Sequence, residues 1–198
     1  MCPLGIQKGC SVSFSRAQPT FAKTFSVGTQ KEALAELAEL AQKATAHPLV
    51  RNTALKIVRG CASRDDECEL EAIFNAVKHG DPAVKPLRKG LKYVADPRWT
   101  DYFESPVDLL TMCLKDACGS DCDGHTALLV SLAGSLGWRM GLRAWGPKDG
   151  DELIHVYAVA AFPKRPPFQR SIGLDTTVPE FKLGSEPPKG NVLTAWLE

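Results

Sequence analysis

Residues 118–145 read CGSDCDGHTALLVSLAGSLGWRMGLRAW, and the spacing of their apolar side chains changes part-way through. After a Gly/Ser/Asp turn, the apolar residues recur at helical spacing. From Trp138 to Trp145 the pattern becomes that of an extended chain. The change predicts a helix over about 123–136 that ends at Gly137 and leads directly into a strand.

Strand signals continue from there toward the C-terminus. Pro147–Gly150 predicts a hairpin turn, and Leu153–Phe162 predicts the next strand. A proline-rich loop then leads to a third strand at Arg170–Leu174. Glu186–Gly190 reads as a surface loop before a short end that carries Trp196. This part of the chain is therefore expected to form an antiparallel sheet.

The N-terminal half carries helical signals after an arm without periodicity. We expect residues 1–28 to be loosely ordered. Thr29, followed by Glu32, forms a capping box that predicts the first helix. Further helix starts or spans are predicted at 48–59, at Asp65 or Asp66, and at Ser105-Pro106. Helices first and antiparallel strands last indicate one α+β domain over residues 29–198.

Composition excludes several classes of protein. Lys and Arg number 24 against 23 Asp and Glu, and no stretch is basic enough to indicate nucleic-acid binding. The longest apolar runs are too short to span a membrane, and the first residues lack the apolar segment of a signal peptide. We therefore expect a soluble cytoplasmic protein that has no nucleic-acid or membrane partner. No cofactor is expected either.

Seven cysteines cannot all pair within one chain, and in a reducing compartment most are expected to be free thiols or metal ligands. Cys61 and Cys68 are interpreted as marking two helix ends rather than as a disulfide bridge. A cluster of Cys113, Cys118, Cys122 and His125 raises the alternative of a zinc site. None of its spacings is the CxxC knuckle of common zinc sites, so no metal is predicted.

Three residues have the types and the order of a cysteine nucleophile with its base and its orienting acid. Cys122 precedes the predicted helix, where unpaired N–H groups and the helix dipole favour a thiolate. His155 lies in a predicted strand, and Asp175 ends another. Each residue also has an alternative, purely structural role. Cys122 could be a buried cysteine that packs in the core, His155 a strand histidine with satisfied hydrogen bonds, and Asp175 a turn residue. Asp121 and Asp123 also fit the role of helix caps, and their charges would oppose the thiolate.

The segments that carry these residues resemble the transglutaminase-like cysteine peptidase superfamily. The matching motifs are Ser120-Asp121-Cys122-Asp123-Gly124-His125, Ser135-Leu136-Gly137-Trp138, His155-Val156-Tyr157 and Leu174-Asp175-Thr176-Thr177. The resemblance covers about residues 85–178. Two positions depart from the family pattern: Ser120 replaces a glycine, and Gly124 replaces an acidic residue.

The resemblance implies both a fold and a chemistry. The fold would be a papain-like or transglutaminase-like core, with the nucleophile helix packed on the C-terminal sheet. Cys122 would attack an amide carbonyl, His155 would act as the base, and Asp175 would hold the imidazole in one tautomer. The backbone N–H of Cys122 and a donor from the preceding loop, such as Trp99 or Tyr102, would form the oxyanion hole.

The resemblance also implies partners and a biological setting. The substrate would be a peptide or protein, and water as second nucleophile would make the protein a cysteine protease or amidase. Small members of this kind are common among bacteriophage and prophage virion proteins, which places the chain in the host cytoplasm or the virion beside other virion proteins. Two alternatives remain: a transglutaminase that transfers the acyl group to an amine, and a non-enzymatic virion module that retains the fold. His125 is expected to be structural.

Overall fold

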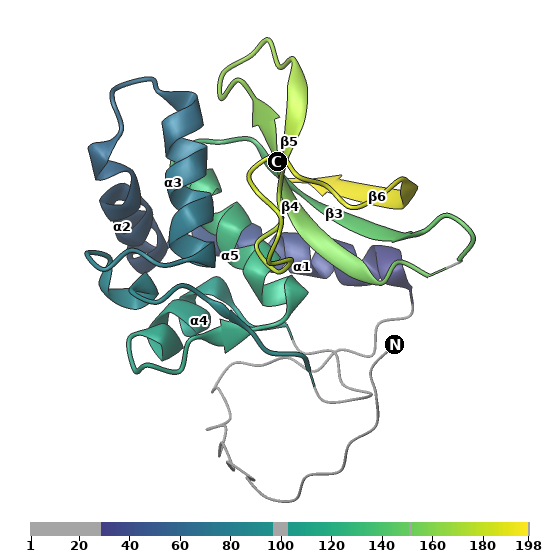
Figure 1. Ribbon diagram of the computed structural model, residues 1–198, viewed down its shortest axis with the longest axis horizontal. Helices are drawn as coiled ribbons and strands as arrows, with labels where there is room; N and C mark the ends of the chain where they lie inside the picture. The colour runs from purple at the N-terminus through teal and green to yellow at the C-terminus, as the bar shows by residue number, and fades with distance from the viewer. Residues whose placement is uncertain (1–28, 97–102, 151, 198) are drawn as a thin grey trace, which may run out of the picture.

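The computed structural model describes residues 29–96, 103–150 and 152–197, and Figure 1 draws the remaining residues in grey. Within these ranges the chain has an α+β fold, in which five α-helices pack with a four-stranded antiparallel sheet. The predicted α+β class is confirmed, with helices first and an antiparallel sheet at the C-terminal end. The arm predicted at residues 1–28 lies outside the described residues. No helix in the described part of the chain is both long and apolar enough to cross a membrane.

The helices begin where capping residues in the sequence predict that they begin. Thr29 accepts a hydrogen bond from the backbone N–H of Glu32, as a capping box requires. Asp65 and Ser105 cap the third and fourth helices in the same way. The helices are α1 (Gln30–Thr45), α2 (Pro48–Ile57), α3 (Asp66–Lys78), α4 (Pro106–Cys113) and α5 (Cys122–Ser135), with short 3₁₀ turns at Val58–Gly60 and Lys85–Leu87.

Helix α5 is the central element of the molecule. It contacts the other four α-helices and also strands β3 (Met140–Pro147) and β4 (His155–Phe162). Figure 1 shows α2, α3 and α4 on one side of α5 and the sheet on the other. Eleven of its fourteen residues are buried, which explains why its sequence is apolar on nearly every face. Its first turn therefore lies at the junction of helices and sheet.

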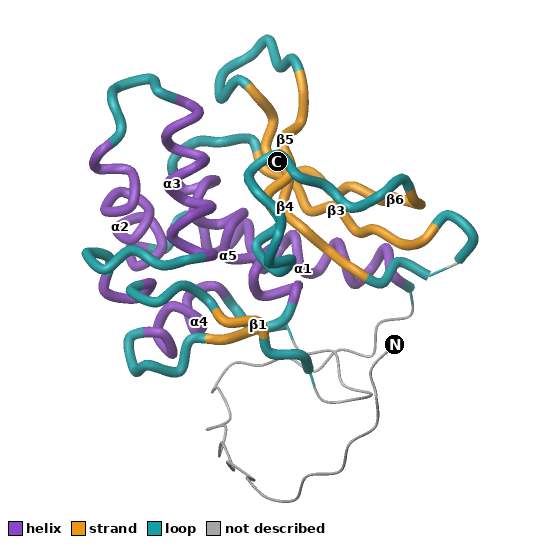
Figure 2. The backbone as a smooth tube through the Cα atoms, viewed as in Figure 1, coloured by secondary structure: helices purple, strands orange, loops and turns teal. Residues whose placement is uncertain are grey.

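The C-terminal sheet has the strand order β5-β4-β3-β6, and all of its neighbours are antiparallel. Strand β5 (Arg170–Leu174) has the predicted bounds, and Figure 2 shows the sheet strands grouped together in orange. Strand β6 (Gly190–Trp196) was predicted only as a short end. It is an edge strand with mostly half-exposed residues, so its sequence lacks the apolar pattern of a buried strand.

A short parallel pair joins the chain before α5 to a distant segment. Strand β1 (Lys92–Tyr93) pairs with β2 (Gly119–Ser120), which leads into the first turn of α5. A side chain at Gly119 would have its Cβ 2.8 Å from a methyl carbon of Val94, so this close pairing favours glycine. Two-residue strands leave no periodic signal, and the sequence did not predict this pair.

Two disulfides correct the prediction of free thiols. Cys61 and Cys68 are bonded to each other, as are Cys113 and Cys118. The interpretation of Cys61 and Cys68 as separate helix ends was wrong, because the short turn into α3 brings their Cα atoms within 5.6 Å. Of the cysteines that the structure describes, Cys122 alone is free.

Candidate active site

The first residue of α5 is the free cysteine. Asp121 caps this helix, and its carboxylate accepts hydrogen bonds from the backbone N–H groups of Asp123 and Gly124 at 3.1 and 3.3 Å. Because the cap engages these two N–H groups, the helix start at Cys122 is sharply defined. The structure thus places Cys122 at the helix N-terminus that the sequence predicts.

His155 and Asp175 lie on neighbouring strands of the sheet. His155 is the first residue of β4, and Asp175 directly follows β5, the antiparallel neighbour of β4. Nε2 of His155 lies 2.8 Å from Oδ2 of Asp175. The other oxygen, Oδ1, accepts hydrogen bonds from the backbone N–H and the hydroxyl of Thr177 at 3.0 and 2.7 Å. Both oxygens of this buried carboxylate are therefore held in place.

Asp175 remains ionised despite its burial. Burial alone raises the pKa of this carboxyl, but the hydrogen bonds from His155 and Thr177 outweigh it and leave the pKa below its usual value. An ionised carboxylate only accepts hydrogen bonds, so Nε2 of His155 carries the proton that is shared with Asp175. Nδ1 is then the nitrogen of His155 that can accept a proton from another group.

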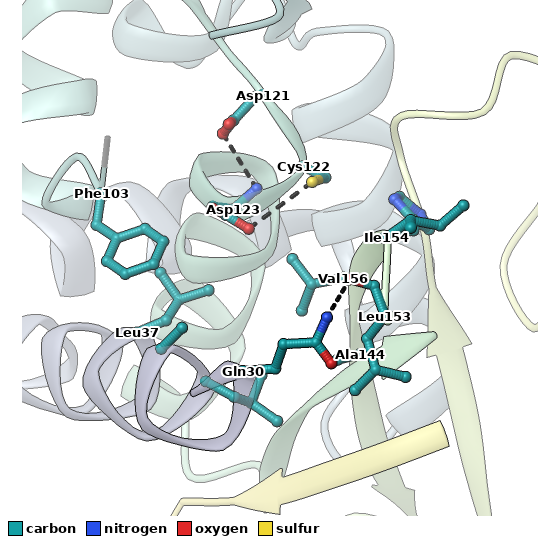
Figure 3. A pocket seen from close by; sticks show the side chains of 13 residues that line it. Gln30, Leu37, Phe103, Asp121, Cys122, Asp123, Ala144, Leu153, Ile154 and Val156 are labelled. Atoms are coloured by element: carbon teal, nitrogen blue, oxygen red, sulfur yellow. Dashed lines mark hydrogen bonds between the residues drawn. The ribbon is translucent and has the colours of Figure 1, made fainter. Parts of the chain in front are cut away.

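Cys122 and His155 line the same pocket, which has a volume of about 460 Å³ (Figure 3). The backbone of Val156, next to His155, lies close enough to the Cys122 sulfur to act against the rise in the pKa of this thiol. The thiol itself donates to Oδ1 of Asp123, with a distance of 3.7 Å between sulfur and oxygen. The structure therefore brings the predicted cysteine, histidine and aspartate to one place, with the thiol turned toward Asp123.

The environment of Cys122 favours the neutral thiol. Burial raises the pKa of this thiol most, and the negative charges of Asp123 and Asp121 raise it further. The backbone of Val156 acts in the opposite direction but does not compensate. In the resting site, burial and the two carboxylates therefore outweigh the effect of the helix N-terminus, which by itself favours a thiolate.

The carboxylates near the start of α5 also act on one another. The pKa of Asp121 is raised to about 6 by burial and by the charges of Asp96 and Glu104, against the backbone N–H groups that it caps. Glu104 is itself buried and accepts a hydrogen bond from the hydroxyl of Ser120 at 2.9 Å. Negative charge is thus concentrated around the N-terminus of α5.

The side chain of Ser120 and the absence of a side chain at Gly124 fit each other. A Cβ atom at Gly124 would overlap the side chain of Ser120, so the hydroxymethyl group of Ser120 occupies the space that a side chain at position 124 would need. The hydroxyl of Ser120 then reaches Glu104. The side chain of Ser120 therefore requires glycine at position 124. Cys122 remains at the start of α5.

His125 connects α5 to the segment that carries Asp175. It is 1% exposed, and its Nδ1 is hydrogen-bonded to the hydroxyl of Thr176 at 2.8 Å. Burial lowers its pKa to about 4, although the Lys92 carbonyl and Asp175 oppose the shift, so the imidazole is neutral near pH 7. This agrees with the structural role that the sequence indicates. Its partner Thr176 was not predicted, because the contact forms only in the folded chain.

Helix α1 contributes a wall of the pocket that sequence reasoning missed. Gln30, Ala33, Leu34 and Leu37 line it, and the Gln30 amide donates to the Leu153 carbonyl at 3.3 Å. The spacing of these apolar residues matches that of a helix face in the core, so no signal in the sequence separates the two roles.

Trp99 and Tyr102 lie outside the described residues, whereas the neighbouring Phe103 lines the pocket. In the described ranges no three His, Cys, Asp or Glu residues are grouped so that they could hold a metal ion.

The fold and the site together define an α+β protein whose free thiol shares a pocket with a histidine–aspartate pair. Comparison with known proteins found no family model, no curated protein and no solved structure that matches this chain. A function must therefore be inferred from the residues of the site.

Proposed function

We propose that the protein is a cysteine-dependent hydrolase of peptide or isopeptide amide bonds, with a papain-like or transglutaminase-like core. The observation that carries the proposal is that Cys122, the free thiol of the described chain, shares a pocket with the His155–Asp175 pair. The other four described cysteines are paired in disulfides, so this thiol is distinguished both by its state and by its place.

The first half of the reaction forms an acyl-enzyme. The Cys122 thiol transfers its proton to Nδ1 of His155 while the sulfur attacks the amide carbonyl. The backbone N–H of Cys122 is one of the four at the helix start without an intrahelical partner, and it can donate to the developing oxyanion. The imidazolium then returns the proton to the leaving amine as the C–N bond breaks, which leaves a thioester on Cys122.

The second half regenerates the enzyme. A water molecule gives a proton to His155 and attacks the thioester, and the acid product leaves as the proton returns to the sulfur. Throughout the cycle Asp175 keeps Nε2 of His155 protonated and stabilises the imidazolium while it exists. Because the resting thiol is neutral, the proton transfer to His155 accompanies the attack and does not precede it.

Turnover assays with matched variants test the proposal. Wild type, Cys122→Ala and His155→Ala are incubated with a library of quenched fluorescent peptides, including branched isopeptides, with and without a labelled amine. We expect cleavage by the wild type only, and the loss in each variant should be about 10³-fold or more. A wild type that is no faster than Cys122→Ala on every substrate would contradict the proposal and favour a non-enzymatic module. Incorporation of the amine in preference to water would identify a transglutaminase instead.

A further inference from the structure

The pocket has mostly apolar walls. Thirteen residues line it, and eight of them are apolar: Ala33, Leu34, Leu37, Phe103, Ala144, Leu153, Ile154 and Val156. They come from α1, from the segment before α4, from β3, and from the end of the β3–β4 connection together with the start of β4. The cavity has a volume of about 460 Å³. An apolar side chain that binds between such walls is removed from water, which makes binding favourable. A ligand with at least one large apolar side chain therefore fits it.

Two carboxylates are found among the described residues that line the pocket. Asp121 and Asp123 line it beside Cys122, and no lysine or arginine occurs among the described residues that line it. The charges of Asp96 and Glu104 reach Asp121 as well. The N-terminal end of the helix dipole contributes the equivalent of about half of one positive charge. The charge near the thiol therefore attracts cations and repels carboxylates and phosphates.

The two carboxylates of the pocket lie together at the start of α5, with apolar residues around them. Figure 3 shows Asp121, Asp123 and Cys122 together at the start of α5, with Leu37 and Gln30 of α1 and Leu153 farther along. A peptide amide at the Cys122 sulfur would thus have both carboxylates and apolar walls beside it. Such an arrangement selects a ligand by two separate properties.

We propose that the pocket binds a peptide whose large apolar side chain lies against α1 and the start of β4 and whose lysine or arginine lies at Asp121 and Asp123. The proposal rests on the proposed function only in taking the reacting amide to lie at Cys122. It defines the substrate class as peptides that combine an apolar and a cationic residue around that amide. Acidic peptides and phosphorylated ligands are excluded by the same charges.

Binding is measured on the full chain with Cys122→Ala, so that no ligand can be cleaved. Four fluorescent peptides differ only at two adjacent positions, with Phe-Lys, Phe-norleucine, Ser-Lys or Phe-Glu, and fluorescence anisotropy gives their Kd values. We expect Phe-Lys to bind tightest, with a loss of about tenfold when either group is replaced and a larger loss for Phe-Glu. Added salt should weaken the Phe-Lys peptide and leave Phe-norleucine nearly unchanged.

Two variants in this background separate the contribution of the carboxylates from that of the apolar wall. Asp123→Asn should remove most of the preference for lysine over norleucine, and Ile154→Ser should reduce the preference for Phe over Ser. Ile154 is 61% exposed, so its replacement leaves the core intact, and Val192→Ser on β6 is the matched control because Val192 is 57% exposed and does not line the pocket. The control should bind all four peptides as the parent does.

The possible results separate this inference from the proposed hydrolase. Equal affinity for Phe-Glu and Phe-Lys, or no effect of either pocket variant, would overturn the substrate class even if the wild type cleaves peptides. Selective binding without cleavage by the wild type would contradict the hydrolase and leave the binding inference standing.

Discussion

At the scale of single residues, the Cys122 thiol lies between electrostatic influences of opposite sign. The N-terminal end of α5 offers the equivalent of about half a positive charge, which favours the thiolate. Asp121 and Asp123 each place a negative charge beside it, and burial removes the water that would stabilise the thiolate. The carboxylates and burial therefore outweigh the helix dipole. A cationic substrate group bound at these carboxylates would reduce their effect and so favour ionisation of the thiol.

We expect Asp123→Asn to move the alkylation of Cys122 to lower pH. Asparagine removes one of the two negative charges that raise the pKa of the thiol, although burial, the largest cause, remains. The rate of reaction with iodoacetamide, followed against pH by mass spectrometry, measures the shift. Asp108→Asn is the matched control, because Asp108 lies in the first turn of α4 and does not line the pocket. An unchanged profile for Asp123→Asn would show that its charge does not reach the sulfur.

Asp175 should make folding stability depend on pH in the acid range. Its folded-state pKa is below its usual value, so its contribution is present above the unfolded pKa of about 3.9 and is lost as pH falls through the folded pKa. Asp175→Asn should therefore destabilise the protein at pH 7 by roughly 1–3 kcal/mol. Urea unfolding of both proteins at pH 7 and at successively lower pH below 4 should show this difference shrinking. A difference that is constant across this range would mean that ionisation of Asp175 contributes nothing to stability.

At the scale of elements, sequence reasoning succeeded where local signals determine structure. The caps at Thr29, Asp65 and Ser105, the end of α5 and the bounds of β5 follow from side-chain chemistry and periodicity within a few residues. The meeting of His155 and Asp175 also follows, because two neighbouring antiparallel strands place them at one end of the sheet.

Features that depend on distant parts of the chain were not predicted. Edge strand β6 has few buried residues, and the pair of β1 with β2 involves two residues on each side. The α1 wall of the pocket and the hydrogen bond between His125 and Thr176 form only when distant segments pack together. The orientation of the Cys122 thiol toward Asp123 likewise depends on packing, because β4 and α1 close the pocket around it.

The start of α5 has a cap whose charge costs stability. Asp121 supplies the capping oxygen, but burial and neighbouring carboxylates raise its pKa to about 6, so stability is lost as pH rises from about 4 through 6. Asn also caps helices well. Asp121→Asn should therefore be more stable than wild type at pH 8 by on the order of 1 kcal/mol, and the gain should vanish near pH 4. Asp121→Ala, which loses the cap, should lose about 1 kcal/mol relative to Asp121→Asn at both pH values. Thermal unfolding at the two pH values measures all three proteins, and equal stability of the Asn and Ala variants would exclude a capping role.

At the scale of the whole molecule, the disulfides brace the helical part and leave the sheet unlinked. Cys61–Cys68 joins the end of the 3₁₀ turn after α2 to the first turn of α3. Cys113–Cys118 joins the last residue of α4 to the segment that leads through β2 into Cys122. Disulfides persist where the surroundings are oxidising, and the cytoplasmic location stays a prediction. The second bond also holds the chain that positions the nucleophile.

The two disulfides should therefore differ in their effect on the site. Replacing both cysteines of either pair by serine should cost about 2 kcal/mol of stability, because each bond closes a short loop. Only Cys113→Ser with Cys118→Ser should also change the alkylation rate of Cys122, since only that loop leads into α5. The Cys61→Ser with Cys68→Ser protein is the matched control, and chemical unfolding and alkylation are measured in buffer without a reducing agent. A prior thiol count should find these four cysteines unreactive in the denatured wild type until it is reduced. If they react without reduction, the disulfides are not formed. If both double variants change the alkylation rate of Cys122 equally, the Cys113–Cys118 bond has no specific role in positioning the nucleophile.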